Sequence, residues 1–474
     1  MKKTLTSLLL VLTLCLGIFA MAGCGTKEMP NFTMPEGGFD VNAPVTITFY
    51  HTMGENLSTV LDYYIKDFNE LYPNITVEHS QVGGYDDVRD QISTEITVQN
   101  QPNIAYCYPD HVALYNLANA VVTLDQFIDS DLEITLANGT KVPMGLTDEQ
   151  KADFITGYYE EGRQFGDGKM YTLPLSKSTE VLYYNKTFFE ANNLTVPTTW
   201  EELEDVCAKI KAIDKNSIPL GYDSEANWFI TMCEQMGSPY TSNDENNHFL
   251  FDNETNHEFV AKFREWYQKG YVTTQEILGS YTSGLFTTTA KDKVKSYMSI
   301  GSSAGATHQR PAADKKGNYP FEVGIAPIPQ IDAENPKAIS QGPSLCIMQS
   351  ADPQEVIASW LFMKFLTTNV AFQAEFSMAS GYAPVIKSVQ DNEIYKGWLD
   401  SSNGYNNLTA LSVKLALSQS NAYFVSPAFN GSSVARDQVG ILMQDALVNT
   451  EADIDAMLER LFKKAVDECE YQAG

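Results

Sequence analysis

The stretch that decides the fold covers residues 171–189 and reads YTLPLSKSTEVLYYNKTFF. Just upstream, Gly166-Asp167-Gly168 predicts a hairpin turn, because glycine adopts positive φ freely. Pro174 predicts a sheet edge or a crossing point, since proline cannot donate a ladder hydrogen bond. Residues 181–184 are β-branched and aromatic, which favours a strand, and Asn185-Lys186 is expected to turn that strand into a helix.

The length and the first residues define the class of protein. A chain of 474 residues is too long for one ordinary core and predicts two or more lobes. Lys2 and Lys3 precede an apolar run that ends at Ala22-Gly23-Cys24, which predicts an export signal over residues 1–23. The same ending is typical of a lipobox, in which cleavage leaves Cys24 lipidated, although Met21 stands where leucine is usual. Plain secretion is the alternative, and a transmembrane anchor is disfavoured because the run is barely long enough to span.

The residues after Cys24 indicate a body held outside the membrane. Residues 24–43 are rich in Gly, Pro and polar residues without periodicity, which predicts a flexible tether. No later apolar run approaches membrane-spanning length, so we expect membrane attachment through the lipid alone. Removing residues 1–23, which carry two lysines and no acids, moves the formal charge from −28 to −30. Such a surface repels nucleic acid.

The cysteines give no sign of a metal site or a disulfide framework. The five that remain beyond Cys24 are widely spaced and contain no CxxC pair, so they are interpreted as buried free thiols (Cys107, Cys207, Cys233, Cys346, Cys469). The sequence therefore predicts neither a metal nor a cofactor.

The first part of the mature chain alternates strands with helices. Val45, Ile47 and Phe49 have the period of a half-buried strand, and apolar residues then recur at helical spacing until Pro73. Further short strands are expected at Ile75 and over residues 104–108, which predicts an open α/β sheet. In such sheets ligands bind beyond the carboxyl ends of the strands. The polar and aromatic residues at those ends are Tyr50, His51, Glu55, Tyr85 and Asp110.

The second part carries its own helix and loop signals. Thr199 and Glu202 form a capping box that predicts a helix start, and Asn227-Trp228 is interpreted as a loop leading into a helix. The chain is expected to return to the first lobe near residue 298 and to cross back after Gly342. These boundaries predict lobe 1 over residues 44–180 and 298–342, and lobe 2 over residues 181–297 and 343–474.

Several segments together resemble a known family. In chain order they are ITFYHTMG, LPLSKSTEVLYYNK, PTTWEEL, SYMSIGSS, VGIAPIP, QGPSLCI and FLTTNVAFQAEFSMASGYAPV. Their order and spacing, over residues 44–470, are similar to those of family 1 extracellular solute-binding proteins, the sugar-binding partners of ABC importers. The resemblance implies a periplasmic-binding-protein-like fold, with two α/β lobes joined by a multi-strand hinge. Within the family, FYHTMG and the GY-P stretch resemble the branch that includes glycerol-3-phosphate-binding proteins.

The resemblance also implies a set of ligand contacts. In the crossing segment these are Ser176, Lys177 and Ser178, and elsewhere the branch's contacts carry over to Tyr85, Asp110, Ser302 or Ser303, Gly342 and Tyr382. The branch holds a phosphate with an arginine in a late GLRLGN turn, whereas residues 429–434 read FNGSSV here. Arg436 follows a few residues later and is a possible substitute. Because a phosphate prefers a bidentate guanidinium, the departure from the motif favours a neutral carbohydrate.

A carbohydrate needs aromatic rings for stacking and polar side chains for paired hydrogen bonds. Trp228 is the first candidate ring, with core packing as its alternative, and Tyr50 and Tyr382 follow. Asp110 and Glu55 are candidate acceptors or, alternatively, helix caps or solvated surface, and His51 is as readily structural. Ser302 and Ser303 precede an expected helix start, whose free N–H groups bind oxygens.

An enzyme is not expected. Residues 301–305 fit G-x-S-x-G, but the only later histidine is His308, which leaves no room for the acid between them in chain order. The sequence therefore predicts a lipid-tethered monomer that captures a small carbohydrate and delivers it to the membrane subunits of an ABC permease. One alternative is binding of glycerol-3-phosphate or a glycerophosphodiester through Arg436. Another is a surface glycosidase or polysaccharide-adhesion protein, since paired carboxylates for glycoside cleavage stay open.

Overall fold

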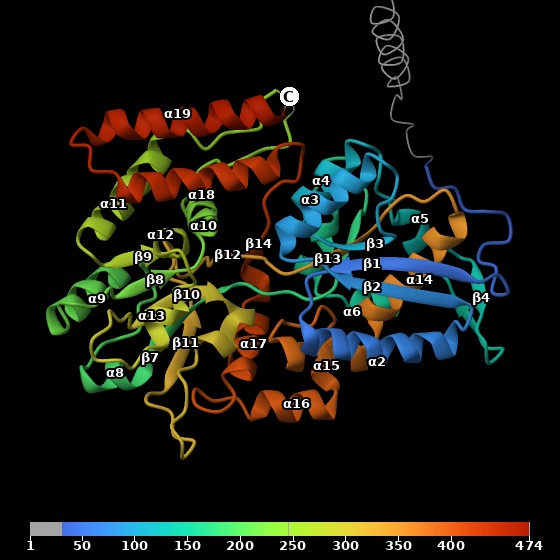
Figure 1. Ribbon diagram of the computed structural model, residues 1–474, viewed down its shortest axis with the longest axis horizontal. Coiled ribbons are helices and arrows are strands. Elements are labelled where there is room, and N and C mark those ends of the chain that lie inside the picture. The colour runs from blue at the N-terminus through green and yellow to red at the C-terminus, as the bar shows by residue number, and fades with distance from the viewer. Residues whose placement is uncertain (1–30, 245, 474) are drawn as a thin grey trace, which may run out of the picture.

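The computed structural model describes residues 31–244 and 246–473 as two α/β lobes lying side by side (Figure 1). The expected export signal and Cys24 lie outside the described residues. Within those residues, no helix is long and apolar enough to cross a membrane, and no three His, Cys, Asp or Glu side chains gather into a metal site. The five cysteines of the described part are buried and unpaired, as predicted.

Lobe 1 contains a five-stranded sheet in which β1 is parallel to both of its neighbours. In sheet order the strands are β2 (Ile75–Gln81), β1 (Val45–His51), β3 (Ile104–Cys107), β13 (Ser344–Ile347) and β6 (Thr172–Pro174). The predicted alternation along β1 is confirmed, because Val45, Ile47 and Phe49 are buried. Helices cover both faces: α2 (Glu55–Leu71), α14 (Pro353–Thr368) and α15 (Val370–Ser380) on one, α3 (Tyr85–Ile96) and α4 (Pro109–Asn116) on the other.

Lobe 2 contains a second five-stranded sheet. In sheet order its strands are β11 (Val323–Pro327), β7 (Glu180–Asn185), β10 (Met298–Ser302), β8 (Leu220–Tyr222) and β9 (Val272–Thr274). The main core lies under α9 (Trp200–Ile213), α10 (Glu225–Met236), α11 (Glu254–Gln268), α18 (Ser432–Val448) and α19 (Ile454–Ala473). The predicted capping box is present: Thr199 Oγ1 accepts from the Glu202 N–H at 3.2 Å. α17 (Leu408–Ser418) packs on the opposite face.

The late segments differ from the predicted division into lobes. β10 and β11, expected in the return to lobe 1, pair with β7 in the sheet of lobe 2. Conversely, β13 lies between β3 and β6 in lobe 1, and α14 and α15 pack on that lobe. The apolar pattern identifies these segments as strands and helices, but it carries no information about which sheet completes its hydrogen bonds with them.

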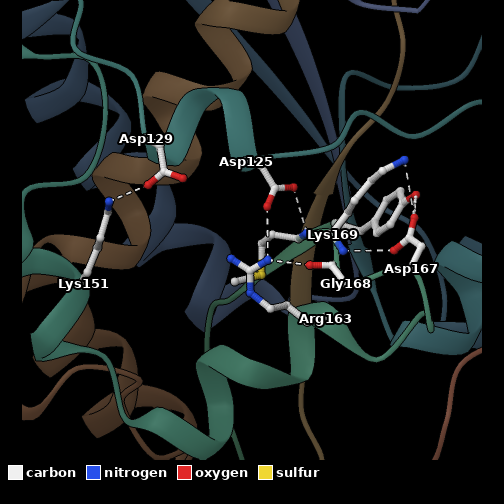
Figure 2. Close-up of polar contacts among 9 residues, drawn as sticks. Asp125, Asp129, Lys151, Arg163, Asp167, Gly168 and Lys169 are labelled. Atoms are coloured by element: carbon white, nitrogen blue, oxygen red, sulfur yellow. Dashed lines mark hydrogen bonds and ion pairs between the residues drawn. The ribbon is translucent and has the colours of Figure 1, made fainter.

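Asp125 holds the turn before the crossing in place (Figure 2). Gly166 and Gly168 adopt φ values of +78° and +74°, but the element directly before them is the 3₁₀ helix Glu161–Arg163, so the turn is not a hairpin. Asp125 accepts from Arg163 Nη1 at 3.1 Å and from the Met170 N–H at 2.9 Å (Figure 2). These hydrogen bonds hold the backbone at Met170, two residues before β6 begins.

Adjacent crossing segments form the hinge. Residues 175–179 lead from β6 to β7, and residues 340–343 lead from β12 (Ala338–Ile339) to β13. The backbones of Ser178 and Gln341 exchange two hydrogen bonds of 2.8 Å. Gly342 has φ +93°, and a Cβ there would lie 2.6 Å from the Ser176 carbonyl oxygen, so this close approach requires glycine.

The described part of the expected tether packs on lobe 1 instead of being free. Within residues 31–43, the Phe32 ring stacks on Phe127 at 5.0 Å, and Phe39 is buried. The Phe32 N–H donates to Gln349 Oε1 at 2.9 Å, and the Asp40 N–H donates to Gln354 Oε1 at 2.8 Å. Two aromatic residues in a Gly/Pro-rich segment are enough to attach it to the lobe, so the body begins by residue 31.

Candidate functional site

A cavity of about 320 Å³ lies between the two lobes. Lobe 1 contributes the start of α3 and the junction of β3 with α4, lobe 2 contributes parts of α10 and α18, and the hinge contributes residues 340–341. The lining side chains used below are Tyr85, Arg89, Tyr108, Asp110, Glu161, Tyr240, Ser432, Ser433 and Arg436.

The lobes touch at this cavity. Ser433, in the first turn of α18, donates to Asp110 Oδ2 at 3.0 Å and accepts from Arg89 Nη1 at 3.3 Å. In Figure 1, one end of α18 lies beside α3 and α4 of the other lobe. Lobe 1 and lobe 2 therefore face one another with direct hydrogen bonds.

The two arginines of the cavity differ in their partners. Arg89 forms ion pairs with Asp86 at 3.1 Å and Asp90 at 2.8 Å. Arg436 donates through Nη2 to Asn227 Oδ1, and no carboxylate of the described residues lies within 4.0 Å of its guanidinium. Arg436 lies one turn from the N-terminus of the 17-residue helix α18, where the helix dipole favours anions. The charge of Arg436 is thus available to an anion.

Tyrosines form the lobe 1 side of the site. The rings of Tyr85 and Tyr108 lie 4.8 Å apart, and the Tyr85 hydroxyl is 3.4 Å from that of Tyr382. Burial raises the pKa of Tyr85, so its hydroxyl stays neutral and can donate or accept. Such faces and hydroxyls suit a polyol.

Sequence-predicted residues fall into two groups. Tyr85, Asp110 and Arg436 line the cavity, and Tyr382 contacts Tyr85. The others lie in the hinge or away from the cavity lining: Ser176, Lys177, Ser178, Gly342, Tyr50, His51, Glu55, Trp228, Ser302 and Ser303.

Lys177 differs from its predicted place at the ligand. Its side chain is completely buried, and Nζ lies 2.6 Å from Glu161 Oε1. The same Nζ donates to the Gly342 carbonyl at 3.1 Å and to Ser344 Oγ at 3.0 Å. All three hydrogens of the ammonium group therefore have partners in the protein, and none is left to bind a ligand. Ser176 and Ser178 are buried beside it in the same crossing.

Trp228 lies in the core instead of a polar loop. Ser224 Oγ accepts from the Asn227 N–H at 3.2 Å and caps α10, so Trp228 lies in the first turn of a helix. Its ring is fully buried, stacked on Tyr222 at 4.9 Å and packed against Phe263 at 4.1 Å. Because Ser224 caps the helix, α10 begins at Glu225, before Asn227-Trp228, which the polar sequence had suggested to be a loop.

Residues at the end of β1 also lie away from the cavity lining. His51 is buried and shares a hydrogen bond of 2.8 Å with His79, and its Nδ1 accepts from the Met53 N–H at 3.0 Å. Tyr50 is half-buried, with its hydroxyl 3.4 Å from Glu95, and Glu55 is exposed at the start of α2. The residues after β3 line the cavity, whereas Tyr50 and His51 at the end of β1 do not. Strand periodicity does not specify this difference.

The two serines at the end of β10, Ser302 and Ser303, bond to nearby backbone N–H groups. Ser303 is buried, and its Oγ accepts from the Thr179 N–H at 3.2 Å. Ser302 Oγ accepts from the Ala304 N–H at 3.2 Å, which caps a short 3₁₀ helix as its position predicted.

Sequence reasoning missed Arg89, Tyr108, Tyr240 and Ser433. Arg89 had a usable signal, because it lies one helical turn after Tyr85 and shares its face. Ser433 also had a signal, because it lies within residues 429–434, the stretch that corresponds to the phosphate-holding turn. Tyr240 had none, because its place in the cavity depends on how the helices of lobe 2 pack.

The comparisons agree with this arrangement. Residues 63–400 match the bacterial extracellular solute-binding protein family. The sn-glycerol-3-phosphate-binding periplasmic protein UgpB of Shigella flexneri is 25% identical over 387 residues, which cover 78% of this chain and 81% of that protein. The protein of the same name from Escherichia coli K12 is 24% identical over the same length and shares.

Solved structures share the fold. UgpB from Mycobacterium tuberculosis in complex with glycerophosphocholine aligns with a TM-score of 0.70 and 17% identity, over 90% of this chain and 99% of that chain. The cyclic α-maltosyl-1,6-maltose binding protein from Arthrobacter globiformis aligns with a TM-score of 0.68 and 19% identity over the same shares. With more than half of its length matched to the family and this two-lobed fold, the chain belongs to the bacterial extracellular solute-binding proteins.

Proposed function

We propose that this protein is the substrate-binding component of an ABC importer and captures a glycerophosphate ester, either glycerol-3-phosphate or a glycerophosphodiester. The observation that carries the proposal is Arg436, which lines the cavity beside the N-terminus of α18 and has no carboxylate partner among the described residues. A guanidinium and a helix N-terminus together suit a phosphate. The relatives that are named as glycerol-3-phosphate-binding proteins support the same ligand class.

Capture would work by closure of the lobes. A ligand that contacts Tyr85 on one lobe and Arg436 on the other binds the closed arrangement better than an open one. The direct bonds of Ser433 to Arg89 and Asp110 would add to that preference. The closed protein would then deliver its ligand to the permease as a monomer, attached to the outer face of the membrane through Cys24.

A neutral carbohydrate is the second candidate. Three tyrosines, Tyr85, Tyr108 and Tyr240, line the cavity and can stack on a sugar face. This candidate does not use the charge of Arg436, which is what separates the two in an experiment.

A thermal-shift screen followed by calorimetry tests the proposal. The tag-free mature protein is exposed to glycerol-3-phosphate, glycerophosphodiesters, and neutral mono-, di- and oligosaccharides. A ligand at a hundred times its Kd stabilises the fold by about 2.7 kcal/mol. We expect a phosphate ester to bind, and Arg436→Gln to weaken that binding at least tenfold while melting within a few degrees of the wild type. Binding of neutral sugars alone would overturn the phosphate proposal in favour of the carbohydrate.

The same screen addresses catalysis. The family consists of transport components, and the named relatives are binding proteins. An oligosaccharide incubated with the protein is therefore expected to come back intact, and release of smaller products would support the glycosidase alternative.

A further inference from the structure

A carboxyl group is buried next to the cavity without a cation in contact. Glu180, the first residue of β7, is 1% exposed. Its Oε2 accepts from the Tyr222 hydroxyl at 2.6 Å, and its Oε1 accepts from Asn227 Nδ2 at 2.9 Å. No Lys, Arg or His of the described residues pairs with it directly. An ionised carboxylate in such a place is costly unless a charge nearby compensates it.

The compensating charge is one amide away. Asn227 accepts from Arg436 through Oδ1 while it donates to Glu180 through Nδ2. Side chains from β7, α10 and α18 thus form a line from the core of lobe 2 to the cavity. Through one neutral amide, the guanidinium at the ligand site is linked to a carboxyl that solvent does not reach.

Two charged residues, Arg436 and Asp223, and two hydrogen-bond donors, Tyr222 and Asn227, act on the carboxyl of Glu180. Burial raises the pKa of Glu180 to about 7, against the hydrogen bonds from Tyr222 and Asn227 and the positive charge of Arg436, which lower it. Asp223, which follows β8, adds to the rise, although its own carboxyl accepts two hydrogen bonds from Thr282. The proton occupancy of Glu180 at neutral pH therefore depends on the charge of Arg436.

We propose that Glu180 is the buried counter-charge of Arg436 and takes up a proton from solvent when an anionic ligand pairs with that guanidinium. The inference rests on the proposed function, since it needs an anion at Arg436. Once the anion neutralises Arg436, nothing offsets the burial of the carboxylate, so protonation becomes favourable. A neutral ligand leaves Arg436 as it was and causes no uptake.

The surroundings accommodate both protonation states. When Glu180 is ionised, Tyr222 and Asn227 both donate to it. When Oε2 carries the proton, the Tyr222 hydroxyl can rotate and accept, while Asn227 continues to donate to Oε1. The Glu180 oxygens keep both partners in either state, and the cost of protonation is that the hydrogen of the Tyr222 hydroxyl gives up its acceptor.

Calorimetry with a ligand that does not itself titrate tests the coupling. Glycerophosphoglycerol is the probe, because a phosphodiester keeps one charge near neutrality, whereas a monoester has a second pKa near 6. Binding is measured at pH 7 in two buffers of different ionisation enthalpy. For the wild type, we expect the observed enthalpy to change with the buffer as uptake of a fraction of one proton requires, and affinity to fall as the pH rises from 6 to 8. For Glu180→Gln, both dependences should become clearly smaller while binding is retained, the remainder coming from His111 and Asp437, which line the cavity and also feel the charge of Arg436.

Glu225→Gln is the matched control. Glu225 is a buried carboxyl at the start of α10, and burial raises its pKa too, but it has no bond to Asn227 or Arg436. Its variant should keep the proton uptake of the wild type. Binding of the diester by the wild type without proton exchange would overturn the inference and leave the proposed function standing.

A second measurement needs no ligand. The infrared band of the protonated Glu180 carboxyl, identified by its loss in Glu180→Gln, is followed against pH in the wild type and in Arg436→Gln. Removing the guanidinium should shift the titration of that band to higher pH. An unchanged titration would refute the link between the two residues, even if the protein binds no phosphate ester and the proposed function fails.

Discussion

At the scale of single residues, the hinge depends on one buried charge pair. Lys177 and Glu161 are 0% and 2% exposed, and their 2.6 Å contact joins the first crossing segment to the wall of the cavity. Ser340 Oγ donates to the other oxygen of Glu161 at 3.1 Å, which brings in the second crossing. The pair thus connects the two crossing segments of the hinge.

Lys177→Ala is expected to destabilise the protein by about 3–5 kcal/mol, because it leaves Glu161 buried without its partner. Urea denaturation followed by circular dichroism measures the loss. Lys169→Ala is the control, because Lys169 pairs with Asp167 at the surface and should cost less than about 1 kcal/mol. Adding Glu161→Gln to Lys177→Ala should restore part of the stability. Equal losses for the two lysines would contradict the role given to Lys177.

His51 gives a second prediction at this scale. Burial, with the neighbouring His79, lowers the pKa of His51 from 6.5 to about 4. Between these values the unfolded chain binds a proton that the native state refuses, so stability falls as the pH falls from 6.5 towards 4, by about 3 kcal/mol at the lower end. His51→Asn, which can still accept from the Met53 N–H, should flatten this dependence in urea titrations at pH 7 and pH 5. The exposed His308→Asn should not, and a steep dependence in both variants would rule out His51 as its source.

At the scale of elements, the segment before β1 is part of lobe 1. Phe32 and Phe39 pack on the lobe, and Asn74 Nδ2 donates to the Ala43 carbonyl at 2.8 Å. The segment therefore covers apolar surface that would otherwise face water.

A protein that begins at residue 44 is expected to be less stable than one that begins at residue 31, by about 2–4 kcal/mol for two aromatic side chains. Urea denaturation of both proteins provides the measurement. Phe32→Ala and Phe39→Ala in the longer protein should each reproduce part of the loss. Identical midpoints for the two lengths would mean that the segment contributes nothing to the lobe.

Sequence reasoning succeeded where one element decides the outcome. β1, the cap of α9 and the crossing at Pro174 follow from local patterns, and the structure agrees with each. It failed where two distant elements meet, since β13 lies in the other sheet. It also failed at one local signal, the cap at Ser224, which places Trp228 in a helix and in the core. The cavity shows both cases, since Tyr85 and Asp110 end predicted elements of lobe 1, whereas Tyr240 depends on packing in lobe 2.

At the scale of the whole molecule, the two lobes meet in polar contacts beside the cavity. Asp110 of lobe 1 accepts from Ser433 of lobe 2 at 3.0 Å, beside the cavity. This bond exists only when the lobes are together, so it favours the arrangement that encloses a ligand.

Asp110→Ala should weaken binding of the ester found in the screen about tenfold, since a hydrogen bond to a charged group contributes about 1.5 kcal/mol or more. Calorimetry gives the affinity, and small-angle scattering should record a smaller ligand-induced decrease in radius of gyration. Asp129→Ala is the control, because Asp129 pairs with Lys151 at the surface of lobe 1, outside the cavity lining. An unchanged affinity in Asp110→Ala would exclude this contact from closure.

The position of β13 has a consequence for how the protein is made. Among the strands of residues 31–244 and 246–473, β6 pairs with β13 alone, and Ser344 of β13 pairs with both Cys107 and Pro174. Because a chain is synthesised from its N-terminus, lobe 1 lacks β13, and the edge of β3 stays open, until all of the sheet strands of lobe 2 have been made. An open edge of this kind pairs readily with other chains. Contacts this distant in sequence also form slowly. The newly made chain is therefore expected to pass through a period in which aggregation competes with folding, and lobe 2 is the part able to complete its sheet first.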